Sequence, residues 1–348
     1  MADPLGSANF LVTGGAGFIG CNFVHELLRR FPQARVTVLD KLTYAGNPAN
    51  LDPVRDHPGF RFVRGDIADA AVVDPLIAEG FDYVVNFAAE THVDRSIGDP
   101  SSFVRTDVFG VYVLLEAVRR HPVRRFLQIS TDEVYGEILG DPVTEEGPLK
   151  PRNPYAASKA GGDRLAFSYW ATYGLPVVVT RCSNNYGPHQ YPEKLIPLFI
   201  TNAFEDQPLP VYGDGRNTRD WIHVLDHVDA LLTLLAADGV DGEVWNIGAG
   251  NELDVLTITD HLLRYTGKPK SLLAYVVDRP GHDRRYALDC SRLTERTGWR
   301  PRRDFAEGLR ETVDWYRQNR AWWEPLKSGE FREYYQRNYK FITPGSSD

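Results

Sequence analysis

Short apolar runs alternate with helical patterns along the first half of the chain. The runs are apolar throughout instead of at every second position, which is typical of strands covered on both faces. This alternation predicts an α/β fold with a Rossmann-like, doubly wound parallel sheet. We expect strands at Asn9–Thr13, Arg35–Leu39, Phe60–Val63, Tyr83–Phe87, Phe126–Ser130 and Val177–Thr180, and helices at Phe18–Arg30, Ala71–Glu79, Ser102–Arg119 and Tyr155–Tyr173.

The pattern changes after Arg181. Prolines from Pro188 to Pro210, followed by Gly213 and Gly215, indicate loops and short elements. Val244–Ile247 again has the pattern of a strand. We therefore expect one domain of residues 1–186 and 221–250 that contains the sheet. A smaller C-terminal substrate domain of residues 187–220 and 251–348 should close over the C-terminal edge of that sheet.

The composition narrows the class of protein. Of 348 residues, 43% are hydrophobic and 25% are charged, as in soluble globular proteins. A net charge of −8 argues against a nucleic-acid partner, which needs a dominant basic face. No apolar stretch approaches the roughly 20 residues of a membrane span, and the N-terminus lacks the pattern of a signal peptide.

The spacing of the cysteines and histidines indicates the cellular compartment and whether a metal site is expected. The three cysteines, Cys21, Cys182 and Cys290, are odd in number and far apart, so no disulfide framework is expected. With no membrane segment, this predicts a cytoplasmic location. The nine histidines show no close ligand spacing, so we expect no metal site.

A glycine motif directly follows the first predicted strand and opens the first predicted helix. Gly14, Gly17 and Gly20 allow a tight turn and a close approach of the backbone to a pyrophosphate. The helix N-terminus offers free N–H groups to the phosphates. Asp40, 20 residues beyond Gly20, would bind the ribose hydroxyls and favour NAD over NADP, although Lys41 beside it weakens that preference.

Asp66 follows the third predicted strand and has two interpretations. Its carboxylate would suit the adenine edge of a dinucleotide. It would equally suit the N-cap of the next element.

Tyr155 and Lys159 are four residues apart on a predicted helix and therefore share a face. A nearby ammonium favours the phenolate and is expected to lower the pKa of Tyr155, making it a base for a sugar hydroxyl. Asp132 and Glu133 follow a central strand, at the sheet edge where ligands bind. Adjacent side chains in a strand point to opposite faces, so both enter one pocket only if the chain turns at Asp132. A solvated acidic turn is the alternative.

Several motifs together resemble the extended short-chain dehydrogenase/reductases that act on nucleotide sugars, and within them the dTDP-glucose 4,6-dehydratase family. The resemblance runs from about Asn9 to about Tyr316. It rests on Gly14–Gly20, Ala89–Ser96, Thr131–Glu133, Tyr155 with Lys159, Ser183–Pro188, Tyr191–Leu195, Arg219–Trp221 and Asp278–His282.

The resemblance implies the dehydration of dTDP-glucose to a 4-keto-6-deoxy sugar, with NAD regenerated in each cycle. Tyr155 would take the C4 hydroxyl proton, Glu133 the C5 proton, and Asp132 would protonate the departing C6 hydroxyl. Thr131 would hold the C4 oxygen, and Lys159 the nicotinamide ribose.

The resemblance also implies two sets of binding residues and a homodimer. NAD contacts are expected at Gly14, Gly17, Phe18, Ile19, Gly20, Asp40, Lys41, Thr43, Asp66, Ile67, Ala88, Ala89, Thr106, Tyr155, Lys159 and Asn185. Sugar-nucleotide contacts are expected at Thr91, Thr131, Asn184, Glu193, Lys194, Leu195, Pro210, Tyr212, Arg219, Asn251, Arg279 and His282. Family members pair through two long helices, here Ser102–Arg119 and Tyr155–Tyr173, although burial against the sheet would give the same apolar pattern.

Three other functions are alternatives to the dehydration that the resemblance implies. A 4-epimerase or decarboxylase for nucleotide sugars would share the first half-reaction, but neither needs an acid at C6. A non-catalytic NAD-binding protein is possible on the same fold, but the intact Tyr155, Lys159, Asp132 and Glu133 argue against it. A metal-dependent hydrolase has no ligand cluster in this sequence.

Overall fold

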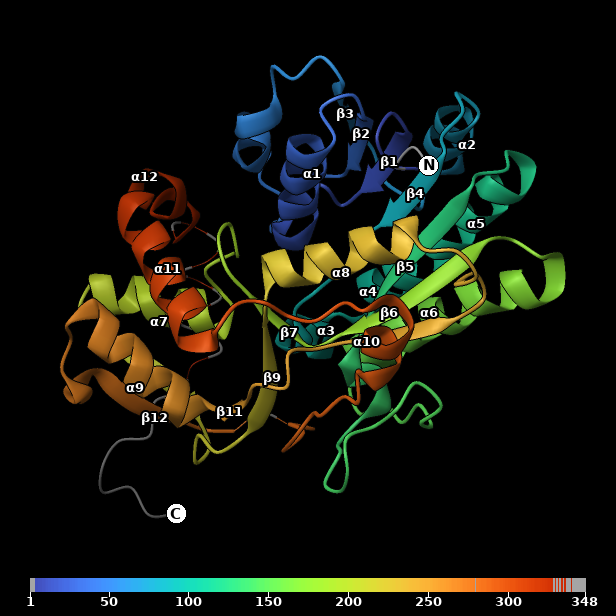
Figure 1. Ribbon diagram of the computed structural model, residues 1–348. Helices are drawn as coiled ribbons and strands as arrows, with labels where there is room; N and C mark the ends of the chain where they lie inside the picture. The colour runs from blue at the N-terminus through green and yellow to red at the C-terminus, as the bar shows by residue number, and fades with distance from the viewer. Residues whose placement is uncertain are drawn as a thin grey trace.

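The computed structural model describes residues 4–278, 280–327, 329, 331, 333, 335 and 339. Within these residues, seven parallel strands form the large sheet in the order β10-β6-β5-β4-β1-β2-β3 (Figure 1). The predicted doubly wound sheet is confirmed. The strands are β1 (Asn9–Thr13), β2 (Arg35–Asp40), β3 (Phe60–Arg64), β4 (Tyr83–Asn86), β5 (Arg125–Thr131), β6 (Val177–Cys182) and β10 (Val244–Ile247).

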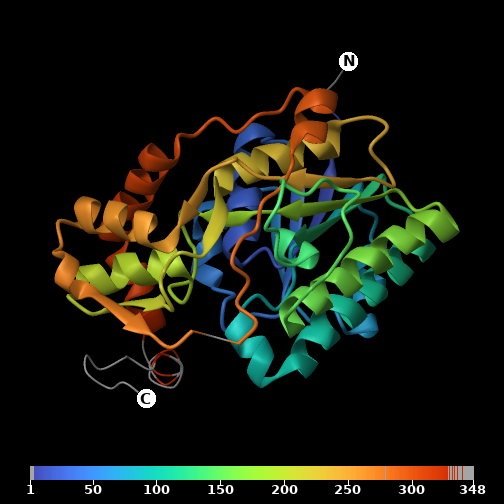
Figure 2. The same cartoon turned by 90° about the horizontal axis from the view of Figure 1, so that it is seen from below.

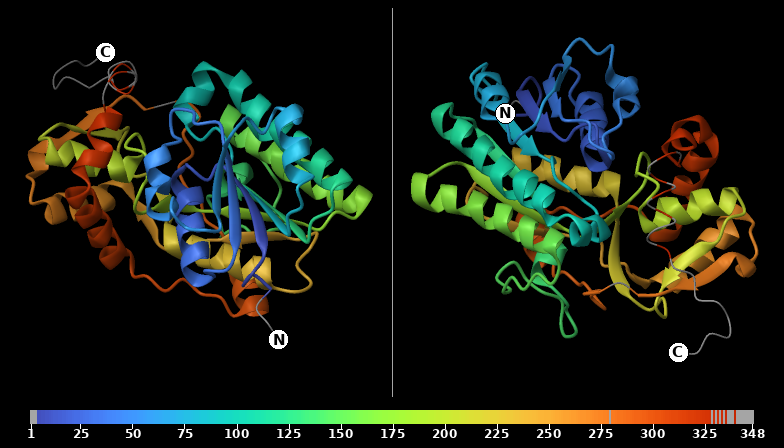
Figure 3. Two further views of the ribbon diagram at one scale, coloured as in Figure 1. Left: turned by 90° about the horizontal axis from the view of Figure 1, so that it is seen from above. Right: turned by 180° about the vertical axis from the view of Figure 1, so that it is seen from behind.

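Helices cover both faces of this sheet. One hydrophobic cluster packs α1 (Phe18–Arg30) and α8 (Val224–Ala236) on one face, and a second packs α2 (Ala70–Ile77), α5 (Val111–Arg120) and α6 (Pro154–Tyr173) on the other. Figure 3 shows α5 and α6 side by side, with α8 across the sheet from them. Because both faces are covered, the strands carry the continuous apolar runs that the sequence shows.

The segment between β4 and α5 differs from the single helix expected at Ser102–Arg119. It consists of α3 (Val93–Gly98), α4 (Pro100–Phe103) and a π-helix, η2 (Val104–Gly110), which runs directly into α5. The wider winding of η2 places Asp107 against α6, where its carboxylate accepts a hydrogen bond from Ser158 Oγ (2.7 Å). π-helical turns are rare and concentrate at functional sites.

A second group of elements lies beside the sheet (Figure 2). It has its own hydrophobic cluster, built around Phe199, Trp221, Leu309 and Trp323. Its helices are α7 (Leu195–Phe204), α9 (Val255–Thr266), α11 (Phe305–Gln318) and α12 (Arg320–Trp323), and its strands are β7 (Asn184–Tyr186), β8 (Leu209–Tyr212), β9 (Thr218–His223), β11 (Glu252–Asp254) and β12 (Leu273–Val276). The short helix α10 (Ser291–Thr297) returns to the large sheet, since Leu293 packs into the cluster of α1 and α8.

Five 3-10 or π turns, η1 (Pro48–Val54), η2, η3 (Asp132–Tyr135), η4 (Lys270–Leu272) and η5 (Pro325–Lys327), connect these elements in the described part of the chain. No helix among the described residues is both long and apolar enough to cross a bilayer.

Candidate active site

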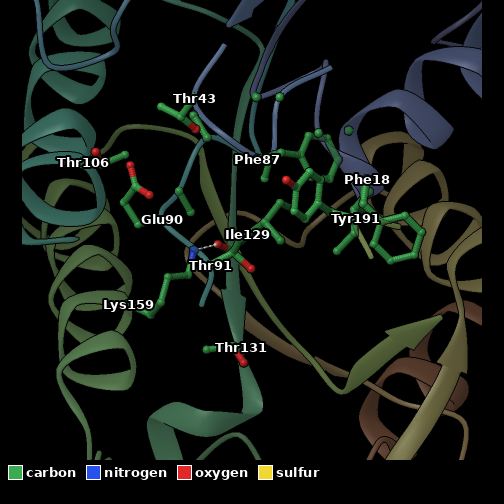
Figure 4. A pocket seen from close by; sticks show the side chains of 18 of the residues that line it. Phe18, Thr43, Phe87, Glu90, Thr91, Thr106, Ile129, Thr131, Lys159 and Tyr191 are labelled. Atoms are coloured by element: carbon green, nitrogen blue, oxygen red, sulfur yellow. Dashed lines mark hydrogen bonds between the residues drawn. The ribbon is translucent and has the colours of Figure 1, made fainter. Parts of the chain in front are cut away.

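A large pocket opens at the carboxyl ends of β1, β2, β4, β5 and β6 (Figure 4). Ligands of open α/β sheets bind at this edge. Every residue expected to contact the cofactor lines the pocket, as do all the expected catalytic residues. Four of the expected substrate residues besides Thr131 also line it: Thr91, Asn184, Glu193 and Lys194.

The chain from β1 into α1 leaves no room for a side chain at Gly14 or Gly20. Gly14 has a φ of +68°, and a Cβ there would lie 2.5 Å from the backbone nitrogen of Ala88. A Cβ on Gly20 would lie 2.3 Å from the carbonyl oxygen of Gly14. Gly17 is the N-cap of α1 and supplies no side-chain cap, so the first N–H groups of the helix face the pocket. This bare helix N-terminus fits a dinucleotide pyrophosphate.

Two carboxylates follow β2 and β3 at the same edge. Asp40 accepts hydrogen bonds from the backbone N–H groups of Ala16 (2.9 Å) and Leu42 (2.8 Å), and burial raises its pKa. Each oxygen keeps a further lone pair for a ribose hydroxyl. Both Asp40 and its neighbour Lys41 line the pocket.

Asp66 pairs with Lys41, whose Nζ lies 2.8 Å from a carboxylate oxygen. Burial would raise the pKa of Asp66, but the bonds from Lys41 and from the N–H of Ala68 outweigh it, so the net shift is downward. The N-cap of α2 is Asp69, which accepts from the N–H of Ala71 (3.0 Å). The alternative in which Asp66 caps the next helix is therefore wrong.

Helix α6 carries Tyr155 and Lys159 into the pocket. Lys159 Nζ donates to the carbonyl oxygen of Ile129 on β5 (2.7 Å), the bond drawn in Figure 4. The pKa of Tyr155 lies well above its usual value because of burial and the nearby carboxylates of Glu133 and Asp107. The expected lowering by Lys159 is therefore wrong in this geometry, since burial and two negative charges together oppose the phenolate.

The chain turns at Asp132, as two adjacent carboxylates in one pocket require. β5 ends at Thr131, and the next four residues form η3. Thr131 Oγ1 fixes the turn, because it accepts from the N–H of Glu133 (3.3 Å) and donates to Asp132 Oδ1 (3.1 Å). Both acidic side chains line the pocket.

The two carboxyl groups have different surroundings. Burial, and then the charge of Glu133, raise the pKa of Asp132 to about 8, and its Oδ2 has no hydrogen-bond partner among the described residues. Glu133 Oε2 lies 3.5 Å from Asn153 Nδ2, which can donate to it, and 3.5 Å from the hydroxyl of Tyr286, which donates its proton to Asp283 Oδ2 (2.6 Å). One pocket thus holds a buried carboxyl with a raised pKa beside a second carboxyl group that accepts a hydrogen bond, a pair suited to acid and base roles.

The remaining expected substrate residues do not line this pocket. Arg219 is buried, with Nη2 donating to the carbonyl of Asp283 (3.0 Å) and its guanidinium 4.2 Å from the ring centre of Tyr286. Tyr212 donates to Asp94 Oδ2 (3.2 Å). Leu195, Pro210, Asn251 and His282 also lie outside the lining, and Arg279 lies outside the described residues.

Sequence reasoning missed several pocket residues. Glu90 and Tyr191 stand inside motifs that were singled out, so their neighbours were a usable signal. Phe87 and Gln190 carried no signal, because an apolar strand end and a lone amide are common anywhere. The remaining missed lining residues are Leu39, Ala45, Gly46, Gly65, Ile129, Ser130, Cys182 and Ser183.

The fold and the glycine, tyrosine and lysine arrangement define a nucleotide-binding protein of the short-chain dehydrogenase/reductase type. A family model described as GDP-mannose 4,6 dehydratase matches residues 11–312. A dTDP-glucose 4,6-dehydratase of Streptomyces niveus is 56% identical over 322 residues, which is 91% of this chain and 95% of the relative. The chain belongs to the dTDP-glucose 4,6-dehydratase family.

Solved structures agree with this assignment. DesIV, a dTDP-glucose 4,6-dehydratase from Streptomyces venezuelae with NAD and TYD bound, matches with a TM-score of 0.89 and 51% identity, covering 92% of this chain and all of that one. The enzyme from Bacillus anthracis, in complex with NAD, matches with a TM-score of 0.86 and 47% identity, covering 92% and 100% of the two chains.

Proposed function

We propose that this protein removes water from dTDP-glucose to form dTDP-4-keto-6-deoxyglucose. The observation that carries the proposal is the turn at Asp132, which brings Asp132 and Glu133 into one pocket with Tyr155 and Lys159. An epimerase or decarboxylase oxidises C4 but has no leaving group at C6 to protonate. A buried carboxyl with a pKa of about 8 beside a second carboxylate therefore favours dehydration.

NAD is the proposed cofactor. The turn of Gly14, Gly17 and Gly20 would hold its pyrophosphate, and Asp40 its adenosine ribose. When bound, NAD would supply hydride chemistry, removing hydrogen from C4 and returning it to C6, so that no cofactor is consumed overall.

The proton transfers of the proposed reaction are assigned to different side chains. Tyr155 would accept the C4 hydroxyl proton, with Thr131 holding the oxygen and Lys159 orienting the cofactor ribose. The new C4 ketone acidifies the C5 hydrogen, which Glu133 would remove. A proton would return to C5 when hydride reaches C6, which completes the methyl group. Asp132, protonated near neutral pH, would donate its proton to the C6 hydroxyl, which leaves as water.

The substrate would span both groups of elements. Thr91, Asn184, Glu193 and Lys194 are proposed to meet the sugar nucleotide inside the pocket. Leu195, Pro210, Tyr212, Arg219, Asn251, Arg279 and His282 are proposed to bind its nucleotide part. We infer a division into residues 1–186 with 221–250 and residues 187–220 with 251–348. Two elements depart from it, because β7 pairs with β9 of the second group and α10 packs against β10 of the large sheet.

A homodimer through α5 and α6 is also proposed. These helices and η2 expose large apolar side chains that would otherwise contact water: Val104, Phe109, Tyr112, Trp170 and Tyr173. A second copy of the chain would cover them. Replacing Phe109 and Tyr112 together by glutamate should give monomers in light scattering, and an unchanged mass would refute the interface.

A cytoplasmic location is supported by the three cysteines, none of which is in a disulfide.

The activity test is direct. The purified protein is incubated with dTDP-glucose, and the product is examined for a 4-keto group by its absorbance in alkali and for a C6 methyl group by NMR. UDP-glucose serves as the comparison substrate. An inverted C4 hydroxyl with no methyl group would instead indicate an epimerase.

A further inference from the structure

A buried polar network lies beneath the pocket and is not part of its lining. The hydroxyl of Tyr135 accepts a hydrogen bond from Arg181 Nη1 (2.7 Å) and donates one to Asn246 Oδ1 (2.8 Å). The guanidinium of Arg181 also makes a two-point contact with Asp163, from Nε (2.8 Å) and Nη2 (3.1 Å). Each of these four residues is at most 2% exposed.

The network joins the two elements that carry the proposed catalytic groups. Tyr135 ends η3, the four-residue turn that begins with Asp132 and Glu133. Asp163 lies on α6, one helical turn beyond Lys159. Arg181, on β6 next to the edge strand β10, contacts both elements at once.

We propose that Tyr135 is a positioning residue, which with Arg181 and Asp163 holds Asp132 and Glu133 in register with Tyr155 and Lys159. This inference rests on the proposed function. It assigns the network a specific effect on water loss, because both proton transfers of that step belong to Asp132 and Glu133 of η3.

The two elements differ in how firmly they are otherwise held. Helix α6 runs for 20 residues and has its own links to the sheet and to η2, through Lys159 to Ile129 and Ser158 to Asp107. η3 is a single turn, in which Val134 is held by apolar packing and Tyr135 makes the buried side-chain hydrogen bonds to Arg181 and Asn246. Loss of the hydroxyl should therefore shift η3 while α6 stays in place.

A buried arginine also needs partners for stability alone, because an unpaired buried charge is costly. That role predicts a general loss of folding stability when Tyr135 changes. The positioning role predicts, in addition, a selective effect on one chemical step and a local loosening of residues 132–136.

The test variant is Tyr135→Phe, which keeps the ring and removes the hydroxyl. We expect overall turnover to fall about 10- to 100-fold, the range that a misplacement near 1 Å can cause. KM should stay within about two-fold of the parent, and single-turnover C4 oxidation should stay near the parent rate, so that reduced nicotinamide accumulates transiently. Amide hydrogen exchange at residues 132–136 should accelerate in the protein without substrate.

The matched control is Tyr169→Phe. Tyr169 lies on α6, and its hydroxyl donates to Glu116 Oε1 on α5 (2.7 Å) and makes no bond to η3. This variant should leave the ratio of the two steps and the exchange at 132–136 unchanged. If Tyr135→Phe does not fold, Asn246→Ala removes the acceptor of the same hydroxyl and should give the same selective slowing.

The positioning role would be overturned if Tyr135→Phe slowed C4 oxidation and water loss equally. It would also be overturned if the ratio of the two rates and the amide exchange at residues 132–136 both stayed at the parent values. If the parent protein does not act on dTDP-glucose, the proposed function fails instead. The exchange measurement would still show whether Tyr135 holds η3.

Discussion

The two carboxyl groups of η3 are chemically alike but are placed in different surroundings. Asp132 is buried next to a negative charge, so its proton is retained up to a pH of about 8. Glu133 is only partly buried, and one of its oxygens lies within hydrogen-bond distance of Asn153 Nδ2. The environment, not the residue type, therefore separates the acid from the base.

Replacing Asp132 by asparagine tests the acid role. Asp132→Asn keeps the shape and removes the transferable proton, so water loss should slow by about 10²–10⁴, the usual contribution of general acid catalysis. C4 oxidation should continue, and reduced nicotinamide should build up in a stopped-flow trace. In the parent enzyme, water loss should decline as the pH rises through about 8. Parent-like turnover with no transient would assign the acid role elsewhere.

Tyr155 is proposed to act as a base, which requires the phenolate, but its surroundings favour the neutral phenol. Tyr155→Phe should abolish C4 oxidation while sugar-nucleotide binding stays within a few-fold, since only one hydroxyl is lost. Because the Tyr155 pKa is raised, oxidation in the parent should speed up as the pH rises. Measured binding by calorimetry and single-turnover rates separate the two effects. Near-normal oxidation by the variant would exclude Tyr155 as the base.

At the scale of elements, the turn from β1 to α1 depends on the absence of side chains. Gly20→Ala would place a Cβ 2.3 Å from the carbonyl of Gly14, so the turn must open and NAD affinity should fall by at least ten-fold. Gly98→Ala is the control, because a Cβ there meets no atom within 4 Å. Fluorescence titration with NADH measures both. Equal affinities would mean that the turn does not depend on close packing at Gly20.

Local signals and distant contacts explain what the sequence could and could not predict. β1, α1 and β10 have the predicted bounds, because each is a local pattern with clear ends. The split of the helix expected at Ser102–Arg119 was not predictable, since the π-helix η2 is stabilised by packing against α6. The short strands β7 and β11 were missed because three residues show no periodicity and pair with β9 from elsewhere in the chain.

The same distinction holds within the site. Gly14, Asp40 and Tyr155 belong to motifs whose spacing can be read along the chain, and all line the pocket. The direction of the Tyr155 pKa shift could not be predicted, because it depends first on burial and then on the charges of Glu133 and Asp107. Asp107 is 48 positions away in sequence and is brought near by η2. The network of Tyr135 and Arg181 could not be predicted either, because these residues are far apart in sequence and meet only in the folded chain.

At the scale of the whole molecule, four neutral histidines lie where the large sheet and its helices meet the second group of elements: His25, His189, His223 and His227. His189 packs on Trp315 of α11, with ring centres 4.6 Å apart, and on His25 of α1, at 5.5 Å. His227 Nδ1 lies 2.9 Å from Asn185 Oδ1, and His223 caps α8. Burial lowers the pKa of all four, to about 3 for His189 and His227 and about 4 for His223.

These shifts predict a loss of stability in mild acid. The unfolded histidines bind protons below about 6.5, whereas the folded ones stay neutral down to about 3 or 4. Their effect on the free energy of unfolding is therefore absent above pH 6.5 and grows as the pH falls toward the folded values. At pH 5 each strongly shifted histidine should cost roughly 2 kcal/mol. Buried carboxyls such as Asp132 act in the opposite direction, so single variants are needed to isolate the histidines.

His223→Asn separates the contribution of one histidine. Asparagine is a good N-cap, so it can keep the bond that His223 Nδ1 accepts from the N–H of Leu225 while removing the titrating group. Denaturant unfolding from pH 8 to pH 5 should show a smaller loss of stability in this variant than in the parent, by about 2 kcal/mol at pH 5. If His223→Asn and the parent lose stability in parallel, the buried histidines do not set the acid limit of this fold, and protonation of paired carboxylates must do so.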